Sequence, residues 1–192
     1  MRQRLKERFL KIEAFKALQH RNFRIVFFAA TLSNTGSWAQ RVAQDWLVLE
    51  LTNNSAQSLG IVTGLQFLPS LLFSLYGGAL ADRFNKRKLL MLTNTGAGLT
   101  SLTLGLLVIS HLVRIEHVFV LAFLLGLFNA IDAPIRQSFT SELVGKGDIA
   151  NAVSLNSANF NAGRLIGPGV SGILISLFGT GPSFIVNAMS EA

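Results

Sequence analysis

Ionisable residues that interrupt long apolar stretches are the first candidates for chemistry in this sequence. Asp82 lies in a basic segment, residues 78–88, that begins at Gly78. A carboxylate at the C-terminal end of a helix is unfavourable unless a cation or the N-terminus of another helix faces it. The segment therefore predicts a tight turn in which Asp82 has a partner. The basic residues of the turn are Arg83, Lys86, Arg87 and Lys88.

A second carboxylate, Asp132, lies near the end of a later apolar stretch. An ionisable group at the centre of a membrane helix costs roughly 2.5–3.5 kcal/mol, so it should face a partner or a wet cavity. We expect Asp132 to pair with Lys86 or Arg83. The alternative is a carboxylate that is simply exposed at the wet membrane interface.

Arg164 lies in the middle of an apolar stretch that also carries amide side chains. Asn156 and Asn159 precede it by one to two helical turns. Polar groups in such surroundings predict the lining of a cavity, and an arginine at this depth predicts binding of an anionic substrate group or an acidic partner. The alternative is a structural arginine that hydrogen-bonds between packed helices.

The first apolar stretch carries polar residues on one helical face. Asn34, Trp38, Arg41 and Asp45 are spaced by four, three and four residues. Arg41 and Asp45 can pair within a helix, and the face is expected to line the outward mouth of a cavity. An ordinary interfacial ion pair is the alternative for these two residues.

Enzyme chemistry finds little support in the sequence. Cysteine is absent, and the three histidines are scattered without a metal-ligand spacing. No glycine-rich loop ends in Gly-Lys-Ser or Gly-Lys-Thr. We therefore expect a protein that is not an enzyme and that has no cofactor and no metal site.

The amino-acid composition indicates that the fold is surrounded by lipid. Of the 192 residues, 50% are hydrophobic and 14% are charged, too few charges to cover a soluble domain, which averages about 25%. Helices are expected because each apolar run is near the roughly 20 residues that cross a bilayer and lacks period-2 alternation. The fold class is an all-α polytopic membrane protein with five full spans and the start of a sixth near Ser183, so that the chain is expected to end inside an element. The five spans are expected at residues 23–49, 58–80, 89–112, 117–140 and 150–178.

Basic residues indicate the orientation of these spans. Residues 1–24, the turn at 83–88 and the link after the fourth span together hold fourteen lysines and arginines, whereas the opposite loops hold Arg114 alone. Positive residues favour the cytoplasmic side, so the N-terminus is expected in the cytoplasm, with the protein in the inner membrane. Residues 1–22 form a basic amphipathic segment suited to an anionic leaflet, and 23–192 the helix bundle. A net charge of +7 therefore reflects membrane lipid and not nucleic acid.

Several glycines and prolines predict how the helices pack and bend. Gly163 and Gly167 recur every four residues with Ser171, which predicts a small-residue stripe for close helix contact. Pro69 and Pro168 each remove an intrahelical hydrogen bond and should bend their helices. Gly172 belongs to the same glycine-rich stretch as Pro168.

The turn at residues 78–88 resembles the cytoplasmic loop signature of the major facilitator superfamily, Gly-x-Leu-Ala-Asp-Arg-x-Gly-Arg-Arg/Lys. Asn85 and Lys86 replace the usual Gly and Arg. Residues 163–172 resemble the exporter signature Gly-x-x-x-Gly-Pro-x-x-Gly-Gly, with Ser171 in place of a glycine. The resemblance implies a gating role for the turn, a partner in a second helical half, and efflux in place of uptake. The gating residues it implies are Gly78, Asp82, Arg83, Lys86, Arg87 and Asp132.

The segments 38–46 and 129–134 resemble the secretion-effector branch of that superfamily, which includes enterobactin exporters. The resemblance covers essentially the whole chain and implies half of a major facilitator fold. It also implies proton-coupled export of a small molecule by alternating access, with the polar residues of the first and fifth spans at the substrate site. The alternatives are a truncated fragment that does not transport, and a membrane structural subunit that needs a partner half.

Overall fold

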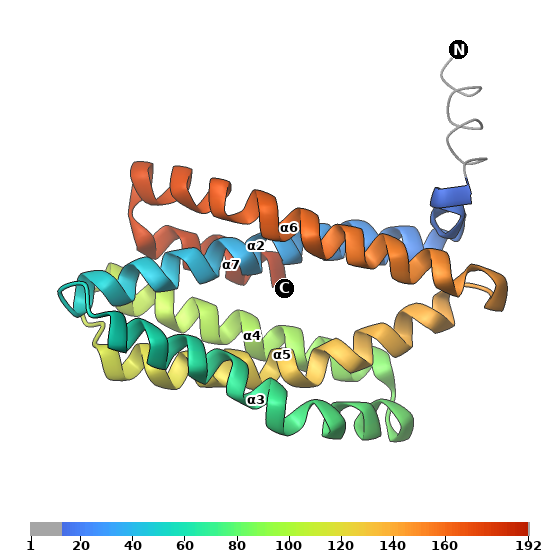
Figure 1. The fold of residues 1–192 in the computed structure, drawn as a ribbon, viewed down its shortest axis with the longest axis horizontal. Helices are drawn as coiled ribbons and strands as arrows, with labels where there is room; N and C mark the ends of the chain where they lie inside the picture. The colour runs from blue at the N-terminus through green and yellow to red at the C-terminus, as the bar shows by residue number, and fades with distance from the viewer. Residues whose placement is uncertain (1–12, 192) are drawn as a thin grey trace, which may run out of the picture.

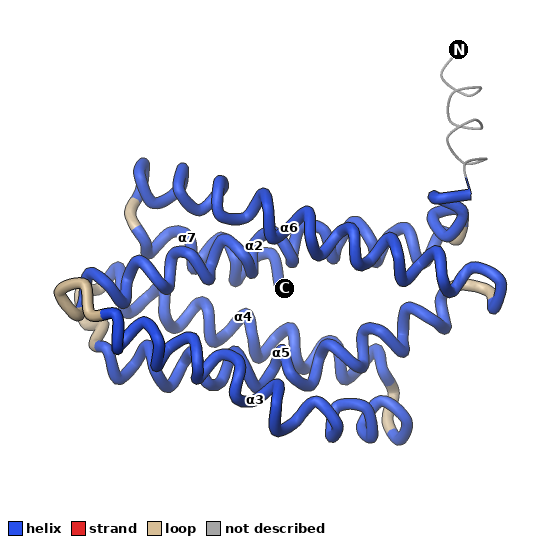
Figure 2. Tube along the Cα trace, in the orientation of Figure 1, coloured by secondary structure: helices blue, strands red, loops and turns tan. Residues whose placement is uncertain are grey.

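The computed structural model describes residues 13–191, and within that range every regular element is a helix (Figure 1, Figure 2). The α-helices are α2 (Arg21–Leu51), α3 (Ala56–Arg83), α4 (Lys86–Ile109), α5 (Ile115–Leu143), α6 (Ile149–Phe178) and α7 (Thr180–Glu191). Within residues 13–191 there are also two short 3-10 helices: η1 (Glu13–Gln19) precedes α2, and η2 (Lys146–Asp148) lies between α5 and α6. Residues 1–12, most of the expected basic amphipathic segment, lie outside the described residues.

The long helices run back and forth along one common direction (Figure 1). The α2–α3, α4–α5 and α6–α7 connections lie at one end of the bundle, and η1, the α3–α4 turn and the α5–α6 turn lie at the other. Each helix end is within three residues of its predicted limit. The hydrophobic patterning therefore located the six α-helices between residues 13 and 191, whereas η1 and η2 were not predicted.

Short connections are stabilised by side chains that cap the following helix. Ser55 accepts a hydrogen bond from the backbone N–H of Ser58 at 3.2 Å, which begins α3. Asn85 accepts one from the N–H of Lys88, also at 3.2 Å, which begins α4. Each cap satisfies an N–H group that a helix leaves unpaired in its first turn, so α3 and α4 can follow their neighbours after very short turns.

The bundle is built from two main helix pairs and a bridging helix. α2 packs along α6, and α3 packs along α5, while α4 contacts both α5 and α7. The apolar core joins α2, α3, α4, α5 and α7 at the end that holds the α2–α3 connection; it includes Val48, Val62, Leu104, Val118 and Phe184. Farther from this end α2 and α5 diverge (Figure 1), and the cavity described below lies between them.

Three helices in the described part of the chain, α3, α4 and α5, are long and apolar enough to cross a membrane. This corrects the prediction of five full spans: α2 and α6 have sufficient length, but polar residues lower the hydropathy of their sequences. The outer surface is strongly apolar, as at Leu71 and Leu75 of α3, which are 81% and 85% exposed. Large exposed apolar surfaces mark contact with lipid or protein. The architecture is that of a helical membrane protein.

Candidate functional site

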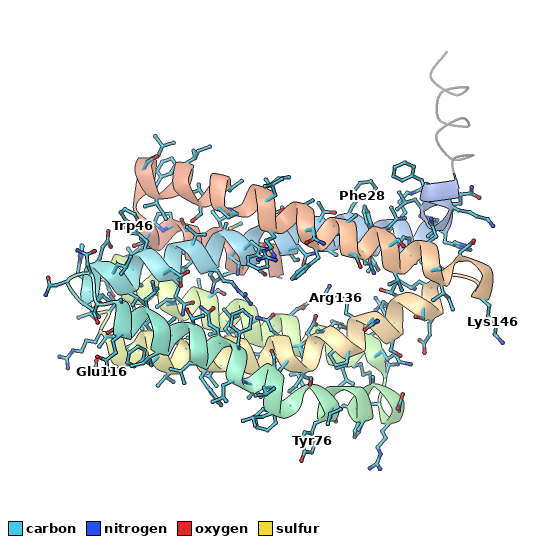
Figure 3. All side chains as sticks on the ribbon, in the orientation of Figure 1. Phe28, Trp46, Tyr76, Glu116, Arg136 and Lys146 are labelled. Atoms are coloured by element: carbon cyan, nitrogen blue, oxygen red, sulfur yellow. The ribbon has the colours of Figure 1, made fainter. Side chains whose placement is uncertain are left out.

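A cavity of about 580 Å³ lies between the diverging helices α2, α5 and α6. Figure 3 shows Arg136 pointing from α5 toward this space. Five of the seven predicted cavity residues line it, on both sides, together with Asp132. The polar and aromatic lining residues of α2 are Asn34, Ser37, Trp38 and Arg41, those of α5 are Asn129, Asp132, Arg136, Gln137 and Thr140, and those of α6 are Asn156, Ser157, Asn159, Phe160 and Asn161.

An ionic network on α4 and α5 forms one wall of the cavity. Arg136 Nε donates to Asp132 Oδ2 at 2.7 Å, one turn along α5. Thr93 Oγ1 donates to Asp132 Oδ1 at 2.8 Å, and Arg136 Nη2 donates to Asn94 Oδ1 at 3.1 Å. Both carboxylate oxygens are thus hydrogen-bonded, as a buried charge requires. The expected pairing of Asp132 with Lys86 or Arg83 was wrong, because a cation on its own helix is in reach.

A small polar pocket of about 60 Å³ lies behind this network, among α2, α4 and α5. It shares Asp132 and Arg136 with the larger cavity. Its volume suits one or two water molecules, each of which needs several polar partners. The carboxylate of Asp132 therefore borders two polar spaces. The hydroxyl and amide residues that line the small pocket are Ser33, Asn34, Ser37, Thr93, Asn94 and Asn129.

An aromatic and cationic cluster lies on the opposite wall, around Trp38 of α2. The guanidinium carbon of Arg41 is 4.8 Å from the centre of the Trp38 ring and 4.9 Å from that of Phe67. The guanidinium carbon of Arg164 is 5.6 Å from the Trp38 ring. Phe160 approaches the same ring edge-on, with 5.6 Å between ring centres. The indole thus contacts two cations, within the range of cation–π attraction.

The expected pair between Arg41 and Asp45 is not formed, since no nitrogen of Arg41 lies within 4.0 Å of an oxygen of Asp45. The guanidinium of Arg41 instead lies against aromatic rings and lines the cavity. Asp45 follows one turn later and is outside the cavity lining. The side chain of Arg164 is exposed, and it reaches Trp38 without being part of the lining.

The two predicted asparagines of α6 join neighbouring helices. Asn156 Nδ2 donates to Thr140 Oγ1 of α5 at 3.1 Å. Asn159 is buried, and its Nδ2 donates to the carbonyl oxygen of Phe27 in α2 at 3.3 Å. Both residues therefore combine a place in the cavity lining with a structural hydrogen bond.

Glycines of α6 let its backbone contact α2 directly. A Cβ atom at Gly167 would lie 2.6 Å from Trp38 Cβ and 3.0 Å from the backbone nitrogen of Ala39. One at Gly163 would lie 3.1 Å from the backbone carbonyl carbon of Asn34. At Gly163 and Gly167 the helices approach as closely as a small-residue stripe would allow. Gly172 does not belong to it, because the space around it is open.

The remaining predicted packing residues divide between α3 and α6. Pro69 is buried halfway along α3, whose ribbon bends near its middle (Figure 1). Pro168 lies inside α6 on its exposed side. In the glycine-rich end of α3, a Cβ at Gly77 would lie 2.7 Å from Pro134 of α5, whereas nothing lies within 4 Å of one at Gly78. Gly77, and not Gly78, therefore allows the close contact.

The side chains of Asp82, Arg83 and Arg87 in the α3–α4 turn are exposed. Within residues 13–191, Asp82 has no hydrogen-bond or ion-pair partner, whereas Lys86 forms an ion pair with Glu142 at the end of α5. The turn is thus connected to α5 through Lys86.

At the same end of the bundle, η1 is held against the α5–α6 turn by charged groups. His20 Nε2 donates to Asp148 Oδ2 at 2.9 Å, and Lys16 Nζ is 3.3 Å from Asp148 Oδ1. The hydrogen bond from His20, followed by the interaction with Lys16, lowers the pKa of the Asp148 carboxyl below its ordinary value of 3.8. The backbone N–H of Ala17 also donates to Asn151 at 2.8 Å.

Sequence reasoning missed most of the α5 wall. Asn129, Asp132, Arg136 and Thr140 recur every three or four residues, so a search for polar helical periodicity would have found them. In the described part of the chain, no three His, Cys, Asp or Glu side chains gather as a metal site would require. The arrangement is suited to binding, with a paired carboxylate facing an arginine-rich aromatic surface.

Comparisons with known proteins agree with these features. The profile of a family of MFS type, described as transmembrane secretion effector, matches residues 12–192. The Staphyloferrin A transporter of Staphylococcus aureus (strain NCTC 8325 / PS 47) is 31% identical over 164 residues, which make up 85% of this chain and 41% of that protein. The multidrug efflux pump Tap of Mycolicibacterium fortuitum is 31% identical over 160 residues, or 81% of this chain and 39% of Tap.

The multidrug resistance protein MdtG of Escherichia coli is 29% identical over 142 residues, which are 73% of this chain and 33% of MdtG. The chain therefore spans about two fifths or less of the length of these relatives. Their names describe transport or drug resistance and no enzymatic reaction. No solved structure matches the chain significantly.

Proposed function

The chain belongs to the transmembrane secretion effector family of the major facilitator superfamily, and from this premise we propose that it forms one helical half of a secondary active transporter. The transporter exports a small molecule across the inner membrane by alternating access. The transport and efflux named for two relatives support this proposal. A second helical half, membrane lipid and a coupling proton are the partners that the proposal requires.

The observation that supports the proposal most strongly is the polar cavity of about 580 Å³ inside a bundle with an apolar outer surface. Its volume lies within the range of about 300–1,000 Å³ typical of small-molecule sites. Polar groups inside a membrane protein are expensive and generally mark substrate or ion pathways. The cavity contributes this half's share of the substrate site.

We propose that α2 and α6 also cross the membrane. At a rise of about 1.5 Å per residue each is roughly 45 Å long, more than the hydrocarbon thickness of about 30 Å. Their polar side chains line the cavity at Asn34, Arg41 and Asn156, so these three residues do not have to face lipid. The positive-inside rule then orients the end that carries η1 and Lys146 toward the cytoplasm.

The topology can be tested with single cysteines, because the chain has none of its own. Arg21→Cys and Gln57→Cys bracket α2, and Gly147→Cys and Ser176→Cys bracket α6. A membrane-impermeant maleimide added to intact cells should label positions 57 and 176 and leave 21 and 147 unlabelled until the cells are opened. Labelling of both members of a pair from one side would exclude a crossing by that helix.

For coupling, we propose that Asp132 carries the proton, because its carboxylate borders both polar spaces and pairs with Arg136. Transport is tested in inside-out vesicles that contain the protein and pump protons inward, with ethidium as the fluorescent probe. Gradient-dependent accumulation should disappear with a protonophore and in Asp132→Asn. Glu116→Gln, an exposed acid at the far end of α5 (Figure 3), is the matched control. Absence of accumulation in the unmodified protein would favour a non-transporting fragment or subunit that needs a partner half.

The α3–α4 turn is the proposed gate between the two halves. Asp82 is exposed and unpaired within residues 13–191, so it is accessible to a helix N-terminus supplied by the second half. Asp82→Asn should slow export at normal expression, because the carboxylate no longer stabilises one of the alternating states. Unchanged export in that variant would remove the gating role of Asp82.

A further inference from the structure

The indole of Trp38 lies close to two guanidinium groups that come from different helices. Arg41 belongs to the same helix, with 4.8 Å from its guanidinium carbon to the ring centre, and Arg164 reaches across from α6, with 5.6 Å. Cation–π attraction helps to hold the cations at the ring, but a π face does not saturate the N–H donors of a guanidinium. The hydrogen-bonding capacity of both arginines is therefore left largely for another group.

In the described part of the chain, no carboxylate forms an ion pair with either arginine, although Asp45, one turn further along α2, interacts electrostatically with Arg41 from beyond 4.0 Å. Within residues 13–191, no acidic oxygen lies within 4.0 Å of a nitrogen of Arg41 or Arg164. Asp132, the acid of the cavity lining, is already neutralised by Arg136 on the far wall. Two guanidinium groups thus share one carboxylate that is not in contact with them, so the wall around Trp38 keeps a net positive charge, which favours the binding of an anion.

The same wall offers aromatic surface. Trp38 and Phe160 both line the cavity and pack edge to face, with an angle of 69° between their rings. About half of the surface of Phe160 is exposed. Flat, rigid rings of this kind favour a planar aromatic ligand, because such ligands stack on a ring face or pack against its edge. The two guanidinium groups and the two aromatic rings are therefore close enough to contact one small ligand at the same time.

From this juxtaposition we propose that the Trp38 wall of the cavity, together with the adjoining Arg164, is a binding site for an aromatic acid, with the carboxylate on Arg41 and Arg164 and the ring against Trp38 and Phe160. Arginine favours this group because its planar fork of donors matches a carboxylate. The inference rests on the proposed function in one respect: it names the chemical class of substrate for the cavity. The ligand is bound without any covalent step.

The test uses the fluorescence of Trp38 itself. The chain has two tryptophans, and the other, Trp46, is exposed and bonded to Glu50, so Trp46→Phe leaves Trp38 as the single reporter. The full chain in detergent or nanodiscs is titrated with para-nitrobenzoate, whose nitroaromatic ring quenches tryptophan. Matched probes are para-nitrobenzamide, with the same ring but no charge, acetate, with charge but no ring, and para-nitrobenzylammonium, with the opposite charge.

Para-nitrobenzoate should bind at least about tenfold more tightly than the amide, as expected for a charge-assisted hydrogen bond. The ammonium probe should bind more weakly still. Acetate should compete with the benzoate only at much higher concentration, because it lacks a ring. Arg41→Gln and Arg164→Gln should each weaken benzoate binding by about tenfold and leave amide binding nearly unchanged. Arg114→Gln, an exposed arginine at the α2–α3 end of the bundle, should have no effect.

Equal affinity for benzoate and amide, preference for the ammonium probe, or unchanged binding in both arginine variants would each overturn the aromatic-acid site. Gel filtration and circular dichroism identify a variant that has not folded. Arg164→Gln then decides the question if Arg41→Gln fails, because Arg164 is exposed. Binding and transport can fail separately. Selective benzoate binding without proton-driven flux of either para-nitrobenzoate or ethidium in vesicles would overturn the proposed transport function, and flux of ethidium without benzoate binding would overturn this site.

Discussion

Two groups of helices accommodate polar residues inside the bundle in different ways. One group is the pair α2 and α6, and the other is α3, α4 and α5. The latter three helices are apolar enough to be recognised as membrane spans, whereas α2 and α6 carry Arg41 and most of the asparagines of the cavity. α2 and α6 are held together by backbone contact at Gly163 and Gly167 and by the hydrogen bond from Asn159 to Phe27. In α4 and α5, a buried ionic network is set among apolar residues.

This difference shows that the mean hydropathy of a helix combines two sets of side chains, those that face lipid and those that face the neighbouring helices. A helix that lines a cavity can be long enough to cross a membrane and still lack an apolar window, because its polar side chains face inward. Such a helix cannot obtain its packing from large apolar side chains on the same face. Small residues and interhelical hydrogen bonds take their place.

The largest expected effect concerns the ionic network of α4 and α5. Asp132→Asn leaves Arg136 without its counterion, and since Arg136 keeps part of its hydration we expect a loss of about 2–3 kcal/mol of stability, somewhat below the range for fully buried pairs. Glu142→Gln removes the more exposed ion pair with Lys86 and should cost less than about 1 kcal/mol. Chemical unfolding in detergent measures both. Equal losses would mean that the interior pair is as well hydrated as the surface pair.

The glycine contact between α2 and α6 should give the next largest effect. Gly167→Ala places a Cβ atom 2.6 Å from Trp38 Cβ, and such overpacking costs about 1–3 kcal/mol. Gly172→Ala, one turn further along α6 in open space, should instead stabilise the helix by up to about 1 kcal/mol. Thermal unfolding of the two variants in the same detergent compares them. The same sign of change in both would contradict the glycine packing described here.

A smaller effect is expected from the hydrogen bond that joins α6 to α2. Asn159→Ala removes the donor to the Phe27 carbonyl and should cost about 1 kcal/mol. Asn161 is exposed and donates to Ser157 of its own helix, so Asn161→Ala should change stability by no more than about 0.5 kcal/mol. The difference in unfolding midpoint between the two alanine variants reports the interhelical bond. A larger loss for Asn161→Ala would reverse the assignment.

The smallest expected effect is the pH dependence of η1 docking. Because the folded state lowers the pKa of the Asp148 carboxyl, its stabilising contribution is complete above the ordinary value and is lost as the pH falls through the lower folded value. Amide hydrogen-exchange protection of residues 13–20, corrected for intrinsic rates, should therefore decrease below about pH 4. Asp148→Asn should remove this pH dependence. A pH-independent wild-type protein would show that Asp148 does not hold η1.

The sequence predicted the helices far better than the contacts among their side chains. Helix limits follow from runs of apolar residues, which depend on local composition alone, and all of them agree within three residues. The partner of Asp132 depends on how α5 is rotated and on which cation is within reach, so Lys86 and Arg83 were plausible from the sequence but wrong. The same applies to Arg41, whose neighbours Phe67 and Trp38 lie on two helices.

The glycine positions show where the sequence was sufficient and where it was not. Gly163 and Gly167 follow a spacing of four that indicates a packed face, and α2 approaches closely at both positions. Gly78 and Gly172 lie in stretches that contain other glycines or prolines, and the sequence does not distinguish which of them packs against a neighbour. The space around Gly78 and Gly172 is open. Which of two adjacent glycines faces a neighbour depends on the helical rotation, which composition does not encode. Cavity membership was predicted best where polar residues recur at helical spacing, as for Asn34, Trp38 and Arg41.

Direct backbone contact between α2 and α6 has a mechanical consequence. With no side chain between Gly167 and Trp38, there is no deformable layer that could absorb a displacement of one helix relative to the other. Any tilt of α6 during a conformational change must be transmitted to α2 at the level of the indole ring. The two helices then move as one rigid body, and the orientation of the Trp38 ring changes with the tilt of that body.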